Sequence, residues 1–108
     1  MKASIDFSIF TRKEGAFGNV SGEISVLTPP QIGDSISFLF PKEGLSIDPS
    51  IGFSGFLKVT ERIISANQDD QPLMLALSDI TLETKSDALG LEEYFESAFD
   101  LFCVTYLE

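Results

Sequence analysis

The sequence of 108 residues predicts a mainly β fold of the α+β class. We expect a curved antiparallel sheet, a β-sandwich or half-barrel of about six strands, with one α-helix from the C-terminal half packed on it. Apolar and polar residues alternate through most of the first 82 residues, and the apolar spacing changes to three and four after Thr84. Hydrophobic residues make up 44% of the chain and include ten Phe, which is enough for one core, so residues 1–108 are expected to form a single domain.

Five segments before the helix carry the strand pattern. They are residues 4–9, 20–26, 35–40, 57–63 and 72–83. In the first, Ile5, Phe7 and Ile9 alternate with serine and aspartate, which is typical of an antiparallel strand with one face in solvent. The fifth, PLMLALSDITLE, is more continuously apolar and is consistent with a central strand covered on both faces.

The connections carry turn-forming residues. KEGAFGN (13–19) is expected to be a hairpin loop, and NQDDQP (67–72) a polar turn. TPPQIGD (28–34) cannot continue a strand, because its two prolines lack a backbone donor. The segment 40–55 is a long loop rich in Gly and Pro, and loops of that length are uncommon unless they are functional or mobile.

One helix is expected after Thr84. In SDALGLEEYFESAFDLF the residues Leu91, Phe95 and Phe99 follow helical spacing. Thr84 or Ser86 can cap the helix, with an aspartate near the positive end of its dipole. Gly90 weakens the first turn, so the firm part is expected over 91–99, followed by a last strand over 101–107.

Charge is unevenly distributed along the chain. Residues 1–68 hold seven acids and six bases, a net charge of −1, whereas residues 69–108 hold ten acids and one base, Lys85, a net charge of −9. Such a concentration costs stability through self-repulsion, and it steers basic partners toward the protein. The charge is therefore the main sequence clue to function.

Most of the helical acids fall on one side. Glu92, Glu93, Glu96 and Asp100 lie within about 100° of one another, opposite the apolar stripe. The like-charge pairs at four-residue spacing each cost about 0.2–0.5 kcal/mol. This side of the helix has two interpretations. It is either a solvated face or a docking face for a basic partner, and in the docking face Tyr94 and Leu89 are apolar anchors. The candidate partner-binding residues are Asp69, Asp70, Glu83, Asp87, Leu89, Glu92, Glu93, Tyr94, Glu96 and Asp100.

Three other ionisable side chains are expected to have a structural and not a functional role. Asp79, in an apolar strand, is expected to pair with Arg62 or Lys58 across the sheet. Glu61 shares a face with apolar neighbours, and a bulge in that strand would turn it outward. Cys103 lies in the apolar run LFCVTYL and, in a chain without histidine to activate it, reads as a buried thiol.

The sequence favours a binding protein over an enzyme. It contains no phosphate-binding loop, no G-x-G-x-x-G after a strand, no G-x-S-x-G and no zinc-ligand cluster, so no catalytic residue, cofactor or metal is predicted. The acidic charge disfavours direct binding of nucleic acid. The opening MKASIDFSIF lacks the apolar core of a signal peptide, no apolar run is long enough for a membrane span, and a cytoplasmic location is expected.

In type, the chain resembles bacterial immunity proteins of polymorphic toxin systems, such as those of contact-dependent growth inhibition. The resemblance rests on small size, a strand-rich pattern, the lack of a catalytic set and the acidic segment SDALGLEEYFESAFD. It implies a monomer that binds a basic toxin domain in a 1:1 complex, with a nuclease as the expected class. The chain would then cover the toxin's active site or substrate groove.

Two further functions stay open at this stage. An acidic nucleic-acid mimic would use the same charge to occupy the DNA or RNA site of an enzyme. A small β-barrel that binds a ligand or acts as an adaptor would use the 41–54 loop as a lid over a mouth lined by Phe40, Phe53 and Phe56.

Overall fold

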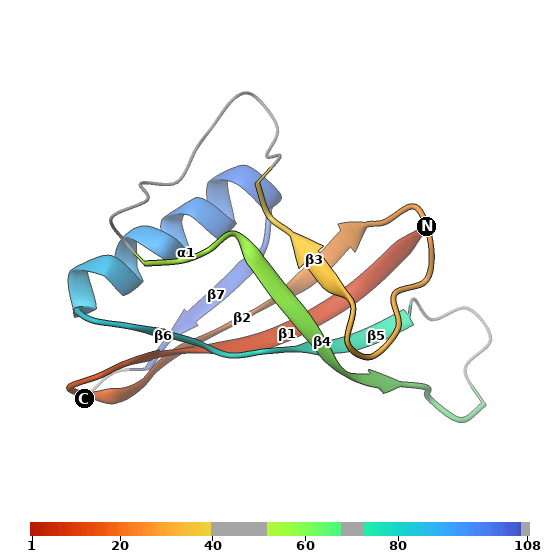
Figure 1. Ribbon diagram of the computed structural model, residues 1–108, viewed down its shortest axis with the longest axis horizontal. Coiled ribbons are helices and arrows are strands. Elements are labelled where there is room, and N and C mark those ends of the chain that lie inside the picture. The colour runs from red at the N-terminus through yellow and green to blue at the C-terminus, as the bar shows by residue number, and fades with distance from the viewer. Residues whose placement is uncertain (40–51, 68–72, 107–108) are drawn as a thin grey trace.

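The computed structural model describes residues 1–39, 52–67 and 73–106, and it has seven strands and one helix in this part of the chain (Figure 1). The elements are β1 (Lys2–Thr11), β2 (Gly15–Ser25), β3 (Ser35–Ser37), β4 (Phe56–Ile63), β5 (Leu73–Leu77), β6 (Ile80–Leu82), α1 (Lys85–Phe99) and β7 (Phe102–Thr105). The predicted fold class, mainly β with one helix packed on a curved sheet, is confirmed.

All the strands join one open sheet in the order β3-β4-β5-β1-β2-β7, and β6 pairs with the second half of β1. The sheet is mixed, because β1 runs parallel to both β5 and β6, while the other neighbours are antiparallel. This corrects the expectation of a purely antiparallel sheet. Alternation in sequence reports which face of a strand is buried, and it carries no information on the direction of the neighbouring strand.

The β1–β2 hairpin is tighter than expected. Its turn occupies residues 12–14, and β2 begins at Gly15, which has a φ of 78° and so suits glycine. Thr11 closes the turn, because its hydroxyl donates to Glu14 Oε1 at 3.0 Å and accepts the Glu14 N–H at 3.2 Å. Residues 15–19 of the predicted loop therefore belong to β2.

The predicted fifth strand is divided into β5 and β6 at Ser78 and Asp79. Its pairing with β1 shifts by one residue across this break, and the Asp79 carboxylate accepts the Ser8 N–H at 2.9 Å. The expected partners Arg62 and Lys58 are not the groups that bind Asp79. The segment is central in the sheet as predicted, but Met74 is 38% exposed, so only one face is fully covered.

β4 contains a bulge where it pairs with β5. The register of this ladder shifts between Val59 and Glu61, and the Glu61 side chain is exposed. The interpretation that a bulge turns Glu61 outward is therefore confirmed.

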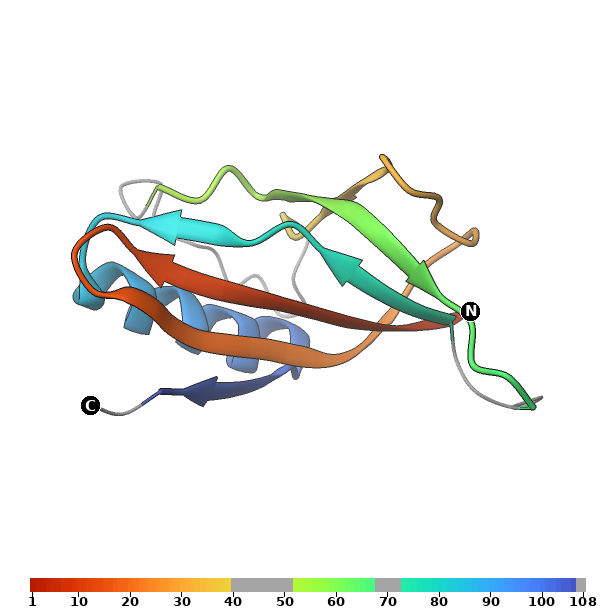
Figure 2. The ribbon, with the colours of Figure 1, turned by 90° about the horizontal axis from the view of Figure 1, so that it is seen from below.

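The helix lies against one face of the sheet, here called the inner face, and the sheet curves around it (Figure 2). Thr84 caps the helix by accepting the Asp87 N–H at 3.1 Å, as one of the two predicted caps. The helix continues through Gly90 and ends at Phe99. Its C-cap is Asp100, which has a left-handed φ of 56° and donates its N–H to the Phe95 carbonyl. The prediction over 91–99 is confirmed, and the helix begins six residues earlier.

Phe95 joins the helix to the sheet. It is fully buried, and its ring centroid lies 5.3 Å from Phe7, 5.4 Å from Phe38 and 5.6 Å from Phe53. Edge-to-face aromatic pairs of this kind each add about 0.5–1.5 kcal/mol to the burial of apolar area. This cluster fixes which side of α1 is buried, and so which side is left to solvent.

Candidate functional site

The exposed side of α1 presents an acidic surface. Its members, here called the acidic flank, are Leu89, Glu93, Glu96 and Asp100, and all four are exposed. At 100° per residue they fall within about 60° of one another around the helix axis. Leu89 is 49% exposed among these carboxylates, so the flank combines an apolar anchor with negative charge.

Two predicted partner-binding residues are buried instead. Glu92 is 5% exposed and Tyr94 is 8% exposed, so neither can form part of a surface in this structure. The Tyr94 hydroxyl donates to the Phe38 carbonyl, which ties the helix to the segment after β3. The expectation that both residues face solvent is wrong, because sequence spacing places them at the borders of the apolar stripe and the neighbouring segments cover those borders.

Glu92 is held by the last strand. Its Oε1 accepts the Thr105 hydroxyl at 2.7 Å, and its backbone carbonyl accepts the Cys103 thiol at 3.6 Å. Its Oε2 has no hydrogen-bond partner among the described residues. Burial raises the pKa of Glu92 above its ordinary value of 4.5; the Thr105 hydrogen bond opposes this rise and the negative charge of Glu96 adds to it.

The other candidates lie apart from the acidic flank. Glu83 forms an exposed ion pair with Arg12 at the β1–β2 turn. Asp87 is half-buried in the first turn of α1 and lies seven residues, about two turns, before Tyr94, hence on the same side of the helix as Tyr94 and at least about 120° from the acidic flank. Asp69 and Asp70 lie outside the described residues.

The sequence reasoning missed the open edge of the sheet at β7. This strand pairs with β2 on one side and ends the strand order. Phe102 is 65% exposed, Val104 44% and Tyr106 43%, and they alternate with Cys103 and Thr105, which face the helix. The alternation in LFCVTYL indicates which side chains share a face of the strand, but it does not indicate that this strand lies at an edge of the sheet.

Cys103 belongs to the inner face of β7. Burial raises the pKa of its thiol to about 12, and the negative charges of Glu92 and Glu96 add to the rise. The thiol is therefore protonated at neutral pH, but it is half-buried, whereas the sequence predicts a buried thiol.

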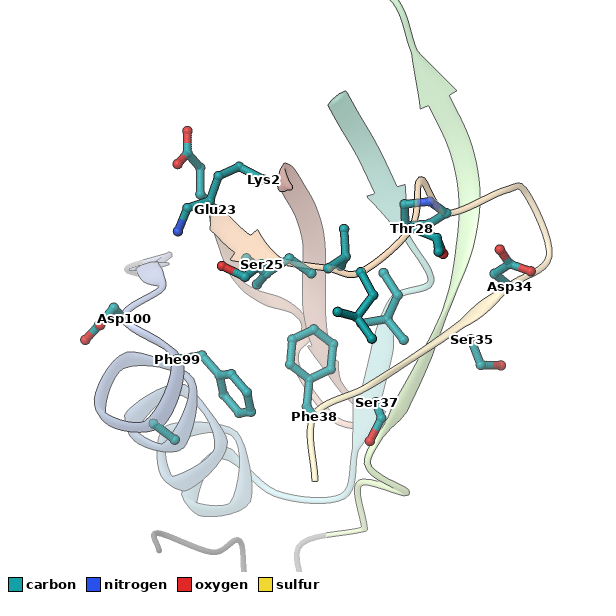
Figure 3. A pocket seen from close by; sticks show the side chains of 16 residues that line it. Lys2, Glu23, Ser25, Thr28, Asp34, Ser35, Ser37, Phe38, Phe99 and Asp100 are labelled. Atoms are coloured by element: carbon teal, nitrogen blue, oxygen red, sulfur yellow. The ribbon is translucent and has the colours of Figure 1, made fainter. Parts of the chain in front are cut away.

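A groove of about 1010 Å³ lies beside the C-terminal end of α1, between the end of β2 and β3 (Figure 3). Phe38 and Phe99 form its apolar wall, and Figure 3 places Lys2, Glu23 and Asp34 around its rim. Among the charged lining residues, Glu23, Asp34 and Asp100 outnumber Lys2. The helix C-terminus adds the negative end of its dipole to this site.

The groove differs from the mouth predicted for a ligand-binding barrel. Phe53 is buried against Phe95 in the core, and Phe56 is 49% exposed on β4, so neither lines the groove. Phe40 and most of the 41–54 loop lie outside the described residues.

No family model, no curated protein and no solved structure matches this chain. Within residues 1–39, 52–67 and 73–106, no helix has the length and hydropathy needed to cross a membrane. The candidate sites are thus defined by their own geometry.

Proposed function

We propose that this chain is a cytoplasmic immunity protein that binds a basic toxin domain, a nuclease in the first place, and neutralises it in a 1:1 complex. The observation that carries the proposal is the acidic flank of α1. Glu93 and Glu96 are exposed there and make no ion pair with any described base. Their repulsion is uncompensated within the described part of the chain, and a cationic partner is the simplest source of compensation.

A nuclease is a suitable partner on physical grounds. An enzyme that grips a phosphate backbone concentrates Lys and Arg around its substrate groove. An acidic surface is steered to such a groove at high rates, and the resulting charge match suppresses binding to neutral or acidic proteins. Covering the groove excludes the nucleic acid without any catalytic group in the inhibitor.

The contact surface that we propose differs from the one expected from the sequence. Glu93, Glu96 and Asp100 supply charge, and Leu89 supplies the apolar anchor. Glu92 and Tyr94 hold the helix in place instead of meeting the partner.

The test begins with affinity capture from the native host at about 0.1 M and about 1 M salt, where the Debye length is about 10 Å and about 3 Å. We expect one basic protein in near-equal amount at low salt. Glu96→Lys should weaken its binding about tenfold at low salt, and less at high salt. Glu61→Lys is the matched control, because it reverses an equally exposed charge on β4.

The captured protein is then expressed in a naive cell with and without this chain. Arrested growth that the wild type restores, and that Glu96→Lys restores poorly, supports the proposal. A captured partner without toxicity, or equal protection by both variants, contradicts it.

The groove favours a second candidate function, the binding of a small ligand with an apolar body and a cationic group. Its wall of Phe38 and Phe99 is apolar, and acids dominate the rim. Titration of benzylamine and benzoate, followed by the NMR signals of Ile24 and Val26, tests this function. Selective shifts with benzylamine support it, and equal or absent shifts exclude it.

A further inference from the structure

We propose that β7 is a docking edge to which the basic partner adds an extended strand, with its basic side chains under the acidic flank of α1 and its apolar side chains beside Phe102 and Val104. The inference rests on the proposed function, because it takes the partner to be basic. It adds the mode of recognition and the sequence pattern that the partner must carry.

The first observation is that β7 has an unpaired side. Tyr106 donates its N–H to the Phe17 carbonyl at 2.9 Å, in line with the antiparallel pairing of Thr105 with Gly18 and Val104 with Asn19. Alternation of the ladder then directs the N–H and C=O groups of Cys103 and Thr105 away from β2. No described strand pairs with that side.

The second observation is that β7, although only four residues long, lacks the other usual protections of an exposed edge. It contains neither lysine nor proline, and its ladder with β2 has no register shift. The opposite edge of the sheet is β3, which is only three residues long. β7 is one residue longer than β3 and its ladder is regular, and its exposed apolar side chains are suited to strand addition.

The third observation places Glu96, a member of the acidic flank, near this edge. Glu92 contacts Thr105, and Glu96 follows Glu92 by one helical turn, on the same side of α1. Figure 2 shows β7 running alongside α1 at the border of the sheet. A strand added to β7 would therefore turn one row of side chains toward Glu96, and the other row toward the outer face with Phe102 and Val104.

The same charge argues against a second copy as the occupant. Pairing β7 with its own copy about a twofold axis would bring two acidic flanks toward each other, between chains that each carry a net charge of −10. A partner strand that alternates Lys or Arg with apolar residues instead forms favourable contacts with both rows of side chains. Its basic residues face Glu96, and its apolar residues lie beside Phe102 and Val104. Such a basic strand is therefore the proposed occupant of the β7 edge.

The experiment uses the full chain and synthetic peptides of about ten residues. One peptide alternates Val with Lys, the second alternates Val with Glu, and the third is the Val/Lys peptide with its central backbone nitrogens methylated. Amide hydrogen exchange of Cys103 and Thr105 is measured by NMR, with affinity from the same titrations.

We expect the Val/Lys peptide to bind at least about tenfold more tightly than either other peptide, and to slow exchange at Cys103 and Thr105. Phe102→Lys should weaken this binding about tenfold, whereas Ile64→Lys, at an apolar side chain that is 81% exposed beyond β4, should leave it unchanged. Both substitutions lie at exposed positions, so the fold is retained.

Each other outcome overturns a defined part of the reasoning. The methylated peptide keeps its charge but cannot add a strand. If it binds tightly and changes NMR signals only in α1, strand addition is overturned and the proposed function is left intact. Equal binding of the Val/Lys and Val/Glu peptides at β7 removes the preference for a basic partner, and with it the proposed function. If the amides of Cys103 and Thr105 already exchange slowly in the free protein, and exchange more slowly at higher protein concentration, a second copy occupies this edge and the inference is overturned.

Discussion

Glu92 offers the sharpest test of the electrostatics of this fold, through the substitution Glu92→Gln. The side chain is 5% exposed, its Oε2 has no hydrogen-bond partner in the described part of the chain, and Glu96 lies one turn away. Glutamine keeps the oxygen that accepts from Thr105 and removes the charge. We therefore expect the variant to be more stable than the wild type at neutral pH.

The expected gain follows from three contributions. Replacing the buried carboxylate by a neutral amide removes the desolvation penalty of a buried charge and contributes about 1–3 kcal/mol. Loss of the repulsion with Glu96 adds about 0.2–0.5 kcal/mol. The hydrogen bond from Thr105 loses its charge assistance, which subtracts about 1 kcal/mol. The net expectation is a gain of about 1 kcal/mol at pH 7, or about 4 °C in Tm.

The raised pKa of Glu92 determines how the stability of the wild type changes with pH. The pKa of Glu92 is raised in the folded state, so the folded protein keeps a proton that the unfolded chain has released. The stability of the wild type therefore falls as pH rises from 4.5 through the folded pKa, and the variant lacks this fall. The difference between them should be near zero below pH 4.5 and grow as the pH rises through the folded pKa of Glu92.

Urea unfolding followed by far-UV circular dichroism measures this difference across the pH range. Glu93→Gln is the control, because Glu93 is exposed and its substitution should change stability by less than about 0.5 kcal/mol. A variant at Glu92 that is less stable than the wild type at pH 7, or a difference that does not vary with pH, would refute the reasoning.

Three further substitutions test the packing by the same unfolding assay. Phe95→Ala should cost about 3–5 kcal/mol, because the ring is fully buried among three phenylalanines; a loss below about 1 kcal/mol would show that it is not the centre of the core. Gly18→Ala should destabilise by at least about 1 kcal/mol, because its new Cβ would lie 2.6 Å from the Val104 carbonyl oxygen, and an unchanged midpoint would contradict the close approach of β2 and β7. Arg12→Ala should change stability by less than about 1 kcal/mol, since its ion pair with Glu83 is exposed, and a larger loss would mean that the pair is part of a wider network.

Much of the architecture was predictable from local pattern. Alternation located β1 and most of β2 and β4, because a strand with one buried face repeats every two residues. Helical spacing and the capping hydroxyl of Thr84 located α1. These features depend on neighbours in sequence, so no tertiary information was needed.

The candidate site was predictable only in part. Leu89, Glu93, Glu96 and Asp100 are exposed, as helical spacing requires. Glu92 differs from Glu96 by one turn only, yet it is buried, because β7 covers that turn and supplies Thr105. A helical wheel shows angles around an axis and cannot show how far along the helix a neighbouring strand extends.

The sequence alone determined the periodicity of each element and the charge of the last forty residues, because both are properties of residue order. The tertiary structure decided the parallel pairing of β1 with β5 and β6, the burial of Glu92 and Tyr94, and the position of β7 at the open edge. These depend on contacts between segments that lie far apart in the chain, and such contacts leave no local period in the sequence.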